Sequence, residues 1–214
     1  MLIKSILETP ENGTAAIVIA GETGSGEECL LLSIGEWKRM RKALGRTVVV
    51  GDAVDEELYD ALHASAEKTA ALHEAVRILS AGDKSAREIR SRLMKKGFSV
   101  QAAEHASAFL TAKGYLCEED ACVRIAQALL RSKHYGKRRI IEYLTAHGYD
   151  ASAAKEAAQS LAEEEYGEAL AYQMEKKYPD AQALSGNERQ KMLAAMIRQG
   201  FSAGDVLTYI KEKQ

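Results

Sequence analysis

The spacing of hydrophobic positions divides the chain into a short β-prone start and a long helical remainder. Residues 14–20 (TAAIVIA) and 28–33 (ECLLLS) are short β-prone runs on either side of a glycine-rich connection at 21–26, a pattern that predicts a β-hairpin. Residues 35–44 predict a helix, and 47–50 (TVVV) predict a third short strand. The first fifty residues therefore predict a small β-rich extension.

From residue 55 onward the apolar positions follow helical spacing. The acidic start of this part suits a helix N-terminus, where carboxylates face the positive end of the helix dipole. A helix is predicted from about Glu56 to Ala81. The positions of its buried face recur at i, i+3, i+4 and i+7: Leu72, Ala75, Val76 and Leu79.

The helical part repeats itself. Three segments align: residues 85–98 (SAREIRSRLMKKGF), 136–149 (GKRRIIEYLTAHGY) and 188–201 (ERQKMLAAMIRQGF). Their glycines are 51 and 52 residues apart and are each followed by an aromatic residue: Gly97, Gly148 and Gly200. Self-similarity at a fixed period near 50 indicates an array of helical units.

Each unit has the signals of three helices with short capped turns. The repeated glycine can end a helix in the left-handed conformation. Ser99, Asp150 and Ser202 follow it, and each is a good N-cap for the next helix. The helices predicted ahead of the repeated segments cover residues 67–81, 118–132 and 163–177.

The expected fold is mainly α, with tandem three-helix repeats in an elongated, curved array behind an N-terminal extension of three strands. The predicted domains are the β-rich extension and three helical repeats, covering residues 1–54, 55–115, 116–162 and 163–214. One unit of about 50 residues has little core, so neighbouring units are expected to complete its burial.

Composition adds a charge asymmetry to this picture. The formal net charge is −2, which excludes a uniformly cationic protein that coats nucleic acid. Residues 84–149, however, hold 13 basic and 6 acidic residues. The near-neutral total is thus a cancellation between a positive middle and acidic ends.

Two basic runs at equivalent repeat positions are the candidate binding residues. The first run consists of Lys84, Arg87, Arg90, Arg92, Lys95 and Lys96. The second run consists of Arg131, Lys133, Lys137, Arg138 and Arg139. These donors could contact phosphates or an acidic groove on a protein, whereas the alternative interpretation is a solvated helix face. The third unit offers a weaker set: Arg189, Lys191 and Arg198.

An ordered set of motifs from about Leu72 to Leu161 resembles the RecX family of regulatory proteins. The motifs are residues 75–79 (AVRIL), 84–89 (KSAREI), 93–98 (LMKKGF), 114–116 (GYL) and 135–140 (YGKRRI), followed by Leu144 and Gly148. The sequence departs from the family in one place, because Cys117-Glu118-Glu119 and Ala121-Cys122 replace the Asp- or Asn-rich turn and the aromatic-Ala pair that usually follow Gly-Tyr-Leu.

The resemblance implies a non-enzymatic modulator. Members of the family bind the RecA recombinase and its filament on single-stranded DNA, lie in the filament groove and restrain ATP hydrolysis and strand exchange. Many also bind DNA directly. The resemblance thus implies a bacterial, cytoplasmic protein of DNA repair, recombination and the SOS response, acting as a monomer. The alternatives are a stand-alone DNA-binding repeat protein and a scaffold for another partner.

Signals for other functions are lacking in the sequence. The stretch at 21–26 has no Lys-Ser/Thr in the register of a phosphate-binding loop, and no nucleophile elbow or metal-ligand spacing occurs. We therefore expect no catalytic residues, no cofactor and no metal. No apolar run approaches the ~20 residues that span a bilayer, and three cysteines cannot all pair within the chain, so a cytoplasmic protein is expected.

Overall fold

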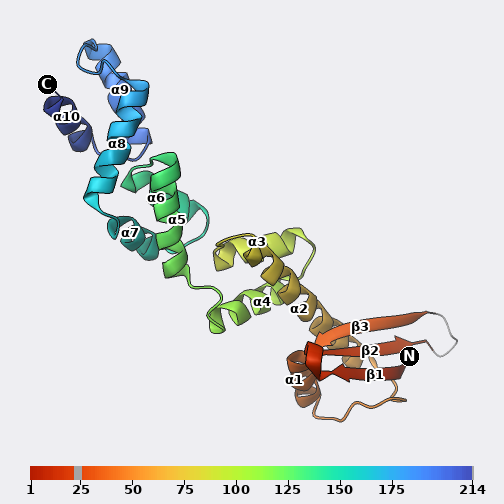
Figure 1. Cartoon of the computed structure of the whole chain (residues 1–214). Coiled ribbons are helices and arrows are strands. Elements are labelled where there is room, and N and C mark those ends of the chain that lie inside the picture. The colour runs from red at the N-terminus through yellow and green to blue at the C-terminus, as the bar shows by residue number, and fades with distance from the viewer. Residues whose placement is uncertain (22–25, 214) are drawn as a thin grey trace. The chain divides into compact units, whose positions relative to one another are not determined.

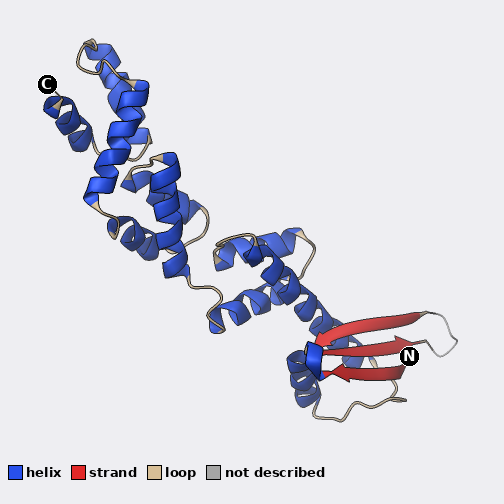
Figure 2. Cartoon of the chain, in the orientation of Figure 1, coloured by secondary structure: helices blue, strands red, loops and turns tan. Residues whose placement is uncertain are grey.

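A computed structural model describes residues 1–21 and 26–213 (Figures 1 and 2). Its strands are β1 Leu2–Thr9, β2 Thr14–Ala20 and β3 Glu27–Ser33, with a 3₁₀ turn η1 at Pro10–Asn12. The helices of the described part are α1 Ile34–Leu44, α2 Glu56–Ser80, α3 Ala86–Lys95, α4 Val100–Ala112, α5 Glu118–Lys133, α6 Lys137–Ala146, α7 Ala151–Gln159, α8 Glu163–Lys177, α9 Gly186–Arg198 and α10 Ala203–Glu212. The predicted fold class, mainly α with a small three-stranded sheet, is confirmed.

The sheet is antiparallel with the order β1-β2-β3. The predicted hairpin of β2 and β3 is confirmed. Of its predicted connection at residues 21–26, residues 22–25 lie outside the described residues. The prediction of a third strand at 47–50 is wrong: that segment is a loop, and β1 is the third strand. A shift in register between Ile3 and Ser5 breaks the period-two pattern of β1, which hid this strand from sequence analysis.

The helix ends agree with the predicted caps. The Ser99 and Ser202 hydroxyls accept hydrogen bonds from backbone N–H groups in the first turns of α4 and α10. The Asp150 carboxylate does the same for α7. Each of these side chains satisfies an N–H that the helix itself leaves unpaired, and therefore fixes where the helix begins.

The chain forms two compact units. The first unit comprises Met1–Gly82 and Ile89–Tyr115, and the second comprises Asp83–Glu88 and Leu116–Gln214. Helix α3 therefore contributes its first turn to the second unit and the remainder to the first. The four predicted domains stay a prediction.

Each unit has its own core. In the first unit the inner face of the sheet, with Ile17 and Leu32, packs with Trp37 of α1 and with Leu58 and Leu62 of α2. Helices α2 and α4 also pack together, and alanines on both are buried, which lets their backbones approach closely. In the second unit one hydrophobic cluster includes residues from every helix from α5 to α10. These six helices therefore share a single core.

Candidate interaction surface

The first basic run lies on α3 and the turn before it. Ile89 and Leu93 are buried, so the opposite side of this amphipathic helix faces water. The exposed members of the run are Arg87, Arg92, Lys95 and Lys96. A cationic helix face is thus present where the sequence predicts it.

Several members of this run have partners within the chain. The Lys84 ammonium donates to the preceding carbonyl at 3.0 Å. Arg90 donates to the Ser107 hydroxyl at 3.4 Å, and the Lys96 ammonium lies 3.2 Å from the Glu74 carboxylate. Arg77 also binds Glu74 through two hydrogen bonds, and these bonds and Lys96 lower the pKa of Glu74 to about 2.

The second run is used more heavily for internal contacts. The Arg138 guanidinium donates to the carbonyl of Ile197 at 3.2 Å, and Arg139 donates to the carbonyl of Arg198 at 3.1 Å. Arg139 also donates to the Gln199 side chain at 3.0 Å. These acceptors lie at the C-terminus of α9, where carbonyls lack helical partners and attract cations. Both arginines therefore hold α9 against α6.

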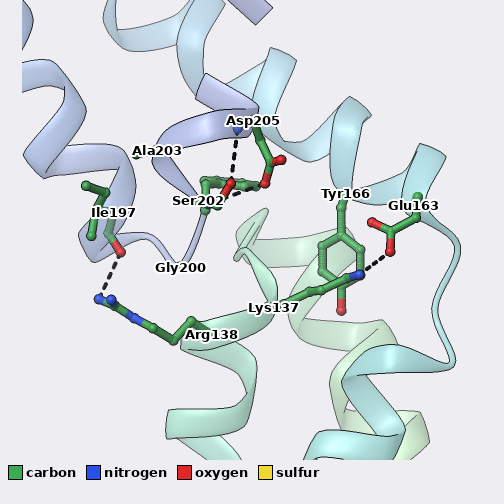
Figure 3. A pocket seen from close by; sticks show the side chains of 10 residues that line it. Lys137, Arg138, Glu163, Tyr166, Ile197, Gly200, Ser202, Ala203 and Asp205 are labelled. Atoms are coloured by element: carbon green, nitrogen blue, oxygen red, sulfur yellow. Dashed lines mark hydrogen bonds and ion pairs between the residues drawn. The ribbon is translucent and has the colours of Figure 1, made fainter. Parts of the chain in front are cut away.

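Lys137 belongs to a pocket of about 590 Å³ (Figure 3). It pairs with Glu163 at the start of α8, and its ammonium lies 5.1 Å from the centre of the Tyr166 ring. Asp205 and Ser202 line the same pocket and bond to each other's backbone N–H groups in a capping box. The charged side chains that line this pocket therefore all have partners within the chain.

Three cations of the two runs have side chains without a hydrogen bond or ion pair in the described part of the chain. They are Arg87, Lys95 and Lys133, and all three are exposed. Arg131 is also exposed and lies 3.9 Å from Glu165, at the outer limit of an ion pair. Of the predicted site residues, Arg87, Lys95 and Lys133 are therefore the most available to a partner.

The start of α3 is joined to the end of α6. The Ser85 hydroxyl donates to the carbonyl of His147 at 2.7 Å. Gly148 adopts a positive φ of 88° there, and a Cβ on it would lie 2.8 Å from the Cβ of Arg87. We call this contact of residues 85–88 with residues 147–149 the first joint.

The same contact recurs one repeat later. The backbone N–H of Gly136 donates to the carbonyl of Gln199 at 2.8 Å, and that of Arg138 donates to the carbonyl of Gly200 at 3.3 Å. Gly136 and Gly200 are both buried, and a Cβ on either would collide with the backbone of the other segment. We call this contact of residues 136–139 with residues 199–201 the second joint.

Neither joint is predicted by the repeat pattern of the sequence, although one signal points to the second joint. Helix α6 begins at Gly136, which has no side chain to cap it, and its first turn holds three basic residues and no acid. A helix start without local acceptors must find them elsewhere. Here the carbonyls at the end of α9 supply them.

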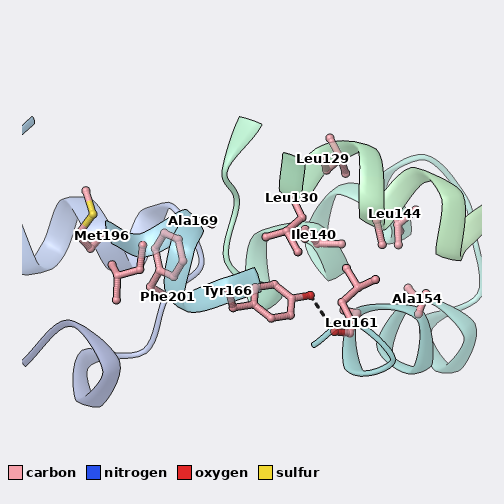
Figure 4. Close-up of a cluster of buried hydrophobic side chains, with 14 of the residues drawn as sticks. Leu129, Leu130, Ile140, Leu144, Ala154, Leu161, Tyr166, Ala169, Met196 and Phe201 are labelled. Atoms are coloured by element: carbon pink, nitrogen blue, oxygen red, sulfur yellow. Dashed lines mark hydrogen bonds between the residues drawn. The ribbon is translucent and has the colours of Figure 1, made fainter. Parts of the chain in front are cut away.

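The hydrophobic cluster behind the second joint fixes its geometry (Figure 4). Ile140 of α6 is fully buried, as is Met196 of α9, and Phe201 packs into the same cluster directly after the joint. The Tyr166 hydroxyl donates to the carbonyl of Ala158 at 2.7 Å, which ties α8 to the end of α7.

Electrostatic contacts support the first joint. Arg124 binds both carboxylate oxygens of Asp83, at 2.9 and 2.7 Å, and holds the pKa of Asp83 below its usual value. The Glu118 carboxylate accepts from the backbone N–H of Ala86 at 2.9 Å. Tyr149 is buried beside this joint, and burial raises the pKa of its hydroxyl, which has no hydrogen-bond partner in the described residues.

Aromatic side chains accompany the basic residues. The Arg139 guanidinium lies 4.2 Å from the centre of the Tyr135 ring, and the Tyr143 ring stacks on that of His147. Tyr115, between the two basic runs in the sequence, is 66 % exposed. The described residues contain no group of three or more metal-ligating side chains, and no described helix has both the length and the apolarity to cross a membrane.

Comparisons with known proteins agree with the resemblance seen in the sequence. Residues 71–110, from α2 to α4, match the model of the first three-helix domain of RecX. No curated protein matches the chain.

Two solved structures have a similar fold. The crystal structure of regulatory protein RecX matches with a TM-score of 0.74 and 17% identity, and the match covers 99% of this chain and 98% of that one. The crystal structure of RecX from Lactobacillus salivarius matches with a TM-score of 0.61 and 17% identity, over 68% of this chain and 96% of that one. The fold of this chain is therefore the fold of RecX proteins.

Proposed function

We propose that this chain is a RecX-family protein that regulates the RecA recombinase, because residues 71–110 match the first three-helix domain of RecX and the chain has the fold of RecX proteins. The protein binds RecA and its filament on single-stranded DNA in the filament groove, and it inhibits ATP hydrolysis and strand exchange. The observation that carries this proposal is the family match at residues 71–110, which includes the exposed basic face of α3.

The proposed contact uses the cations that the fold leaves available. Lys95 and Lys133 are exposed and unpaired, whereas Arg138 and Arg139 hold the end of α9. Reversing the charge of either arginine would therefore disturb the second joint as well as any partner contact. Lys95 and Lys133 are the better positions at which to test the surface.

The test follows ATP turnover and strand exchange by RecA on single-stranded DNA while the protein is added up to an equimolar ratio. Inhibition is expected with the natural chain. The double variant Lys95→Glu/Lys133→Glu is expected to need at least a tenfold higher concentration, because roughly 1.4 kcal/mol of lost binding free energy is a factor of ten. The matched control is Arg189→Glu/Lys191→Glu, which changes the net charge equally on exposed residues of α9. Absence of inhibition by the natural chain would contradict the proposal.

Direct DNA binding is the second candidate, and one feature favours it. Lys133 adjoins His134, whose ring stacks on Tyr172 with centroids 3.9 Å apart, and Tyr172 is 45% exposed. An exposed aromatic beside cations suits single-stranded nucleic acid, because bases stack on the ring while phosphates meet the cations. Binding measured across a salt series should then weaken steeply, since each phosphate contact releases a counterion. RecA inhibition that survives the loss of DNA binding would rule out DNA contact as the mechanism.

A further inference from the structure

The repeated helix-ending glycines are Gly97, Gly148 and Gly200. Of these three, Gly97 at the end of α3 has no other helix start packed against it in the described residues. Gly97 corresponds to Gly148 and Gly200, and all three have a φ between 88° and 96°. At Gly148 and Gly200 the space beside the glycine holds the first turn of another helix. At Gly97 no atom lies within 4 Å of a Cβ position, and the residue is exposed. We call residues 95–98 the open turn.

Three backbone carbonyls of the open turn are unpaired as well. In the two joints the carbonyls that accept from the incoming helix belong to His147, Gln199, Gly200 and the two residues before Gln199. Their counterparts in the open turn include the carbonyls of Lys95, Lys96 and Gly97. No described residue donates a hydrogen bond to these three carbonyls. Unpaired carbonyls at a helix end form the negative pole of the helix dipole.

The two occupied joints show what kind of group fits such a turn. Each occupant is the first turn of a helix that begins at a small residue, Ser85 or Gly136. It brings a hydrogen-bond donor to a carbonyl of the turn and fills the space beside the glycine, with side-chain atoms of Ser85 and Arg87 at Gly148 and with backbone and Cβ atoms of residues 136–139 at Gly200. A helix start and a helix end meet with opposite dipole poles in contact.

We infer that the open turn is a docking site for the N-terminal turn of a helix on a protein partner, with a small N-cap residue and acidic residues in that first turn. The acidic residues of the partner helix are inferred from the positive charge beside the open turn. The last turn of α3 contains two basic residues, Arg92 and Lys95, whereas the last turn of α9, which receives the arginines of α6, contains one, Arg198. Arginines like those at the start of α6 would be repelled there, and carboxylates would be attracted. The inference does not depend on the identity of the partner as RecA.

The test uses a peptide and the full chain. The probe is an acetylated, alanine-rich peptide of about 18 residues with a serine N-cap and two glutamates in its first turn, because shorter helices are marginal in water. A second peptide carries the same residues in reverse order, which moves the carboxylates to the other dipole pole. Backbone ¹⁵N chemical shifts of the protein are followed during titration to several millimolar.

The expected result is a set of shift changes confined to residues 94–98, with half-saturation at about 1 mM, and at least a tenfold weaker response to the reversed peptide. Gly97→Asn should abolish the response, because asparagine tolerates positive φ while its side chain fills the open space. Gly114→Asn is the matched control, since Gly114 also has positive φ and open space but lies outside the repeated set. Circular dichroism checks that both variants fold.

Three results would overturn the inference: no response at residues 94–98, an equal response to the reversed peptide, or a response that Gly97→Asn leaves intact. Equal changes at residues 113–115 would show a general attraction to helix ends and would also overturn it. The reversed-peptide comparison uses the natural chain, so it stands even if a variant misfolds.

Discussion

At the scale of residues, two tyrosines show that a buried hydroxyl stabilises the fold when it has a hydrogen-bond partner and destabilises the fold when it has none. The Tyr166 hydroxyl donates to a carbonyl at 2.7 Å, whereas the Tyr149 hydroxyl is buried without a partner. A buried polar group that lacks a hydrogen bond costs roughly 1–3 kcal/mol. The equivalents of Tyr149 in the other two repeats, Phe98 and Phe201, have no hydroxyl.

Tyr149→Phe is therefore expected to leave the second unit as stable as before or to stabilise it by about 1 kcal/mol. Tyr166→Phe is the control and is expected to destabilise the same unit by about 1 kcal/mol, since it leaves the Ala158 carbonyl without its donor. Urea unfolding of both variants measures the difference. A clear loss of stability in Tyr149→Phe would mean that its hydroxyl has a partner in solution.

Glu74 provides a pH-dependent contribution to the first unit. Arg77 and Lys96 lower its pKa to about 2 from an ordinary 4.5. A carboxylate with a lowered pKa in the folded state stabilises that state above pH 4.5, and the contribution is lost as the pH falls towards 2. Glu74→Gln should thus lose less stability than the natural chain between these pH values. Thermal unfolding at a series of pH values tests this, and parallel curves for the two proteins would contradict it.

At the scale of elements, the start of α6 depends on contacts from another repeat. Arg139 donates two hydrogen bonds to the end of α9 and lies over the Tyr135 ring. A hydrogen bond to a charged group contributes about 1.5–3 kcal/mol when buried, and less when partly exposed. These contacts make Arg139 part of the second joint.

Arg139→Ala is expected to destabilise the second unit by about 1–2 kcal/mol. Arg131→Ala is the matched control, because Arg131 is exposed and its guanidinium lies 3.9 Å from the Glu165 carboxylate, which is near the limit for an ion pair. Its effect should stay within about 0.5 kcal/mol. Chemical denaturation distinguishes the two, and equal effects would argue that the hydrogen bonds of Arg139 contribute nothing.

The elements that sequence analysis predicted well are those with local signals. The helices, the glycine ends and the N-caps Ser99, Asp150 and Ser202 depend on residues within one turn. Strand β1 was missed because its bulge disrupts the alternation, and the joints were missed because they pair segments about 60 residues apart. The basic runs were found, but only the fold separates Lys95 and Lys133, which are available, from Arg138 and Arg139, which are engaged.

At the scale of the whole molecule, the shared core changes what a truncation should do. The repeat pattern predicts residues 163–214 as a separate repeat. In the structure, helices α8 to α10 bury residues of α5 and α6 within one hydrophobic cluster. Removal of these helices would expose buried side chains and leave the second joint without its acceptors.

A chain that ends at residue 162 is therefore expected to lose the cooperative unfolding of the second unit and to keep that of the first, whose core is separate. Differential scanning calorimetry of both lengths measures this, with one transition disappearing. Hydrogen exchange then assigns the surviving transition to residues 1–82 and 89–115. Protected amides in residues 116–162 of the shortened chain would show that the middle repeat folds alone.

The two joints would also allow the number of helical repeats to increase by duplication within the gene. A helix such as α6 offers donors at its first turn and acceptors at its last, so a duplicate of residues 116–162 inserted after residue 162 would meet a matching end on each side. Growth by in-frame duplication would need no newly evolved interface. Repeat number is thus a variable that selection can adjust in whole steps.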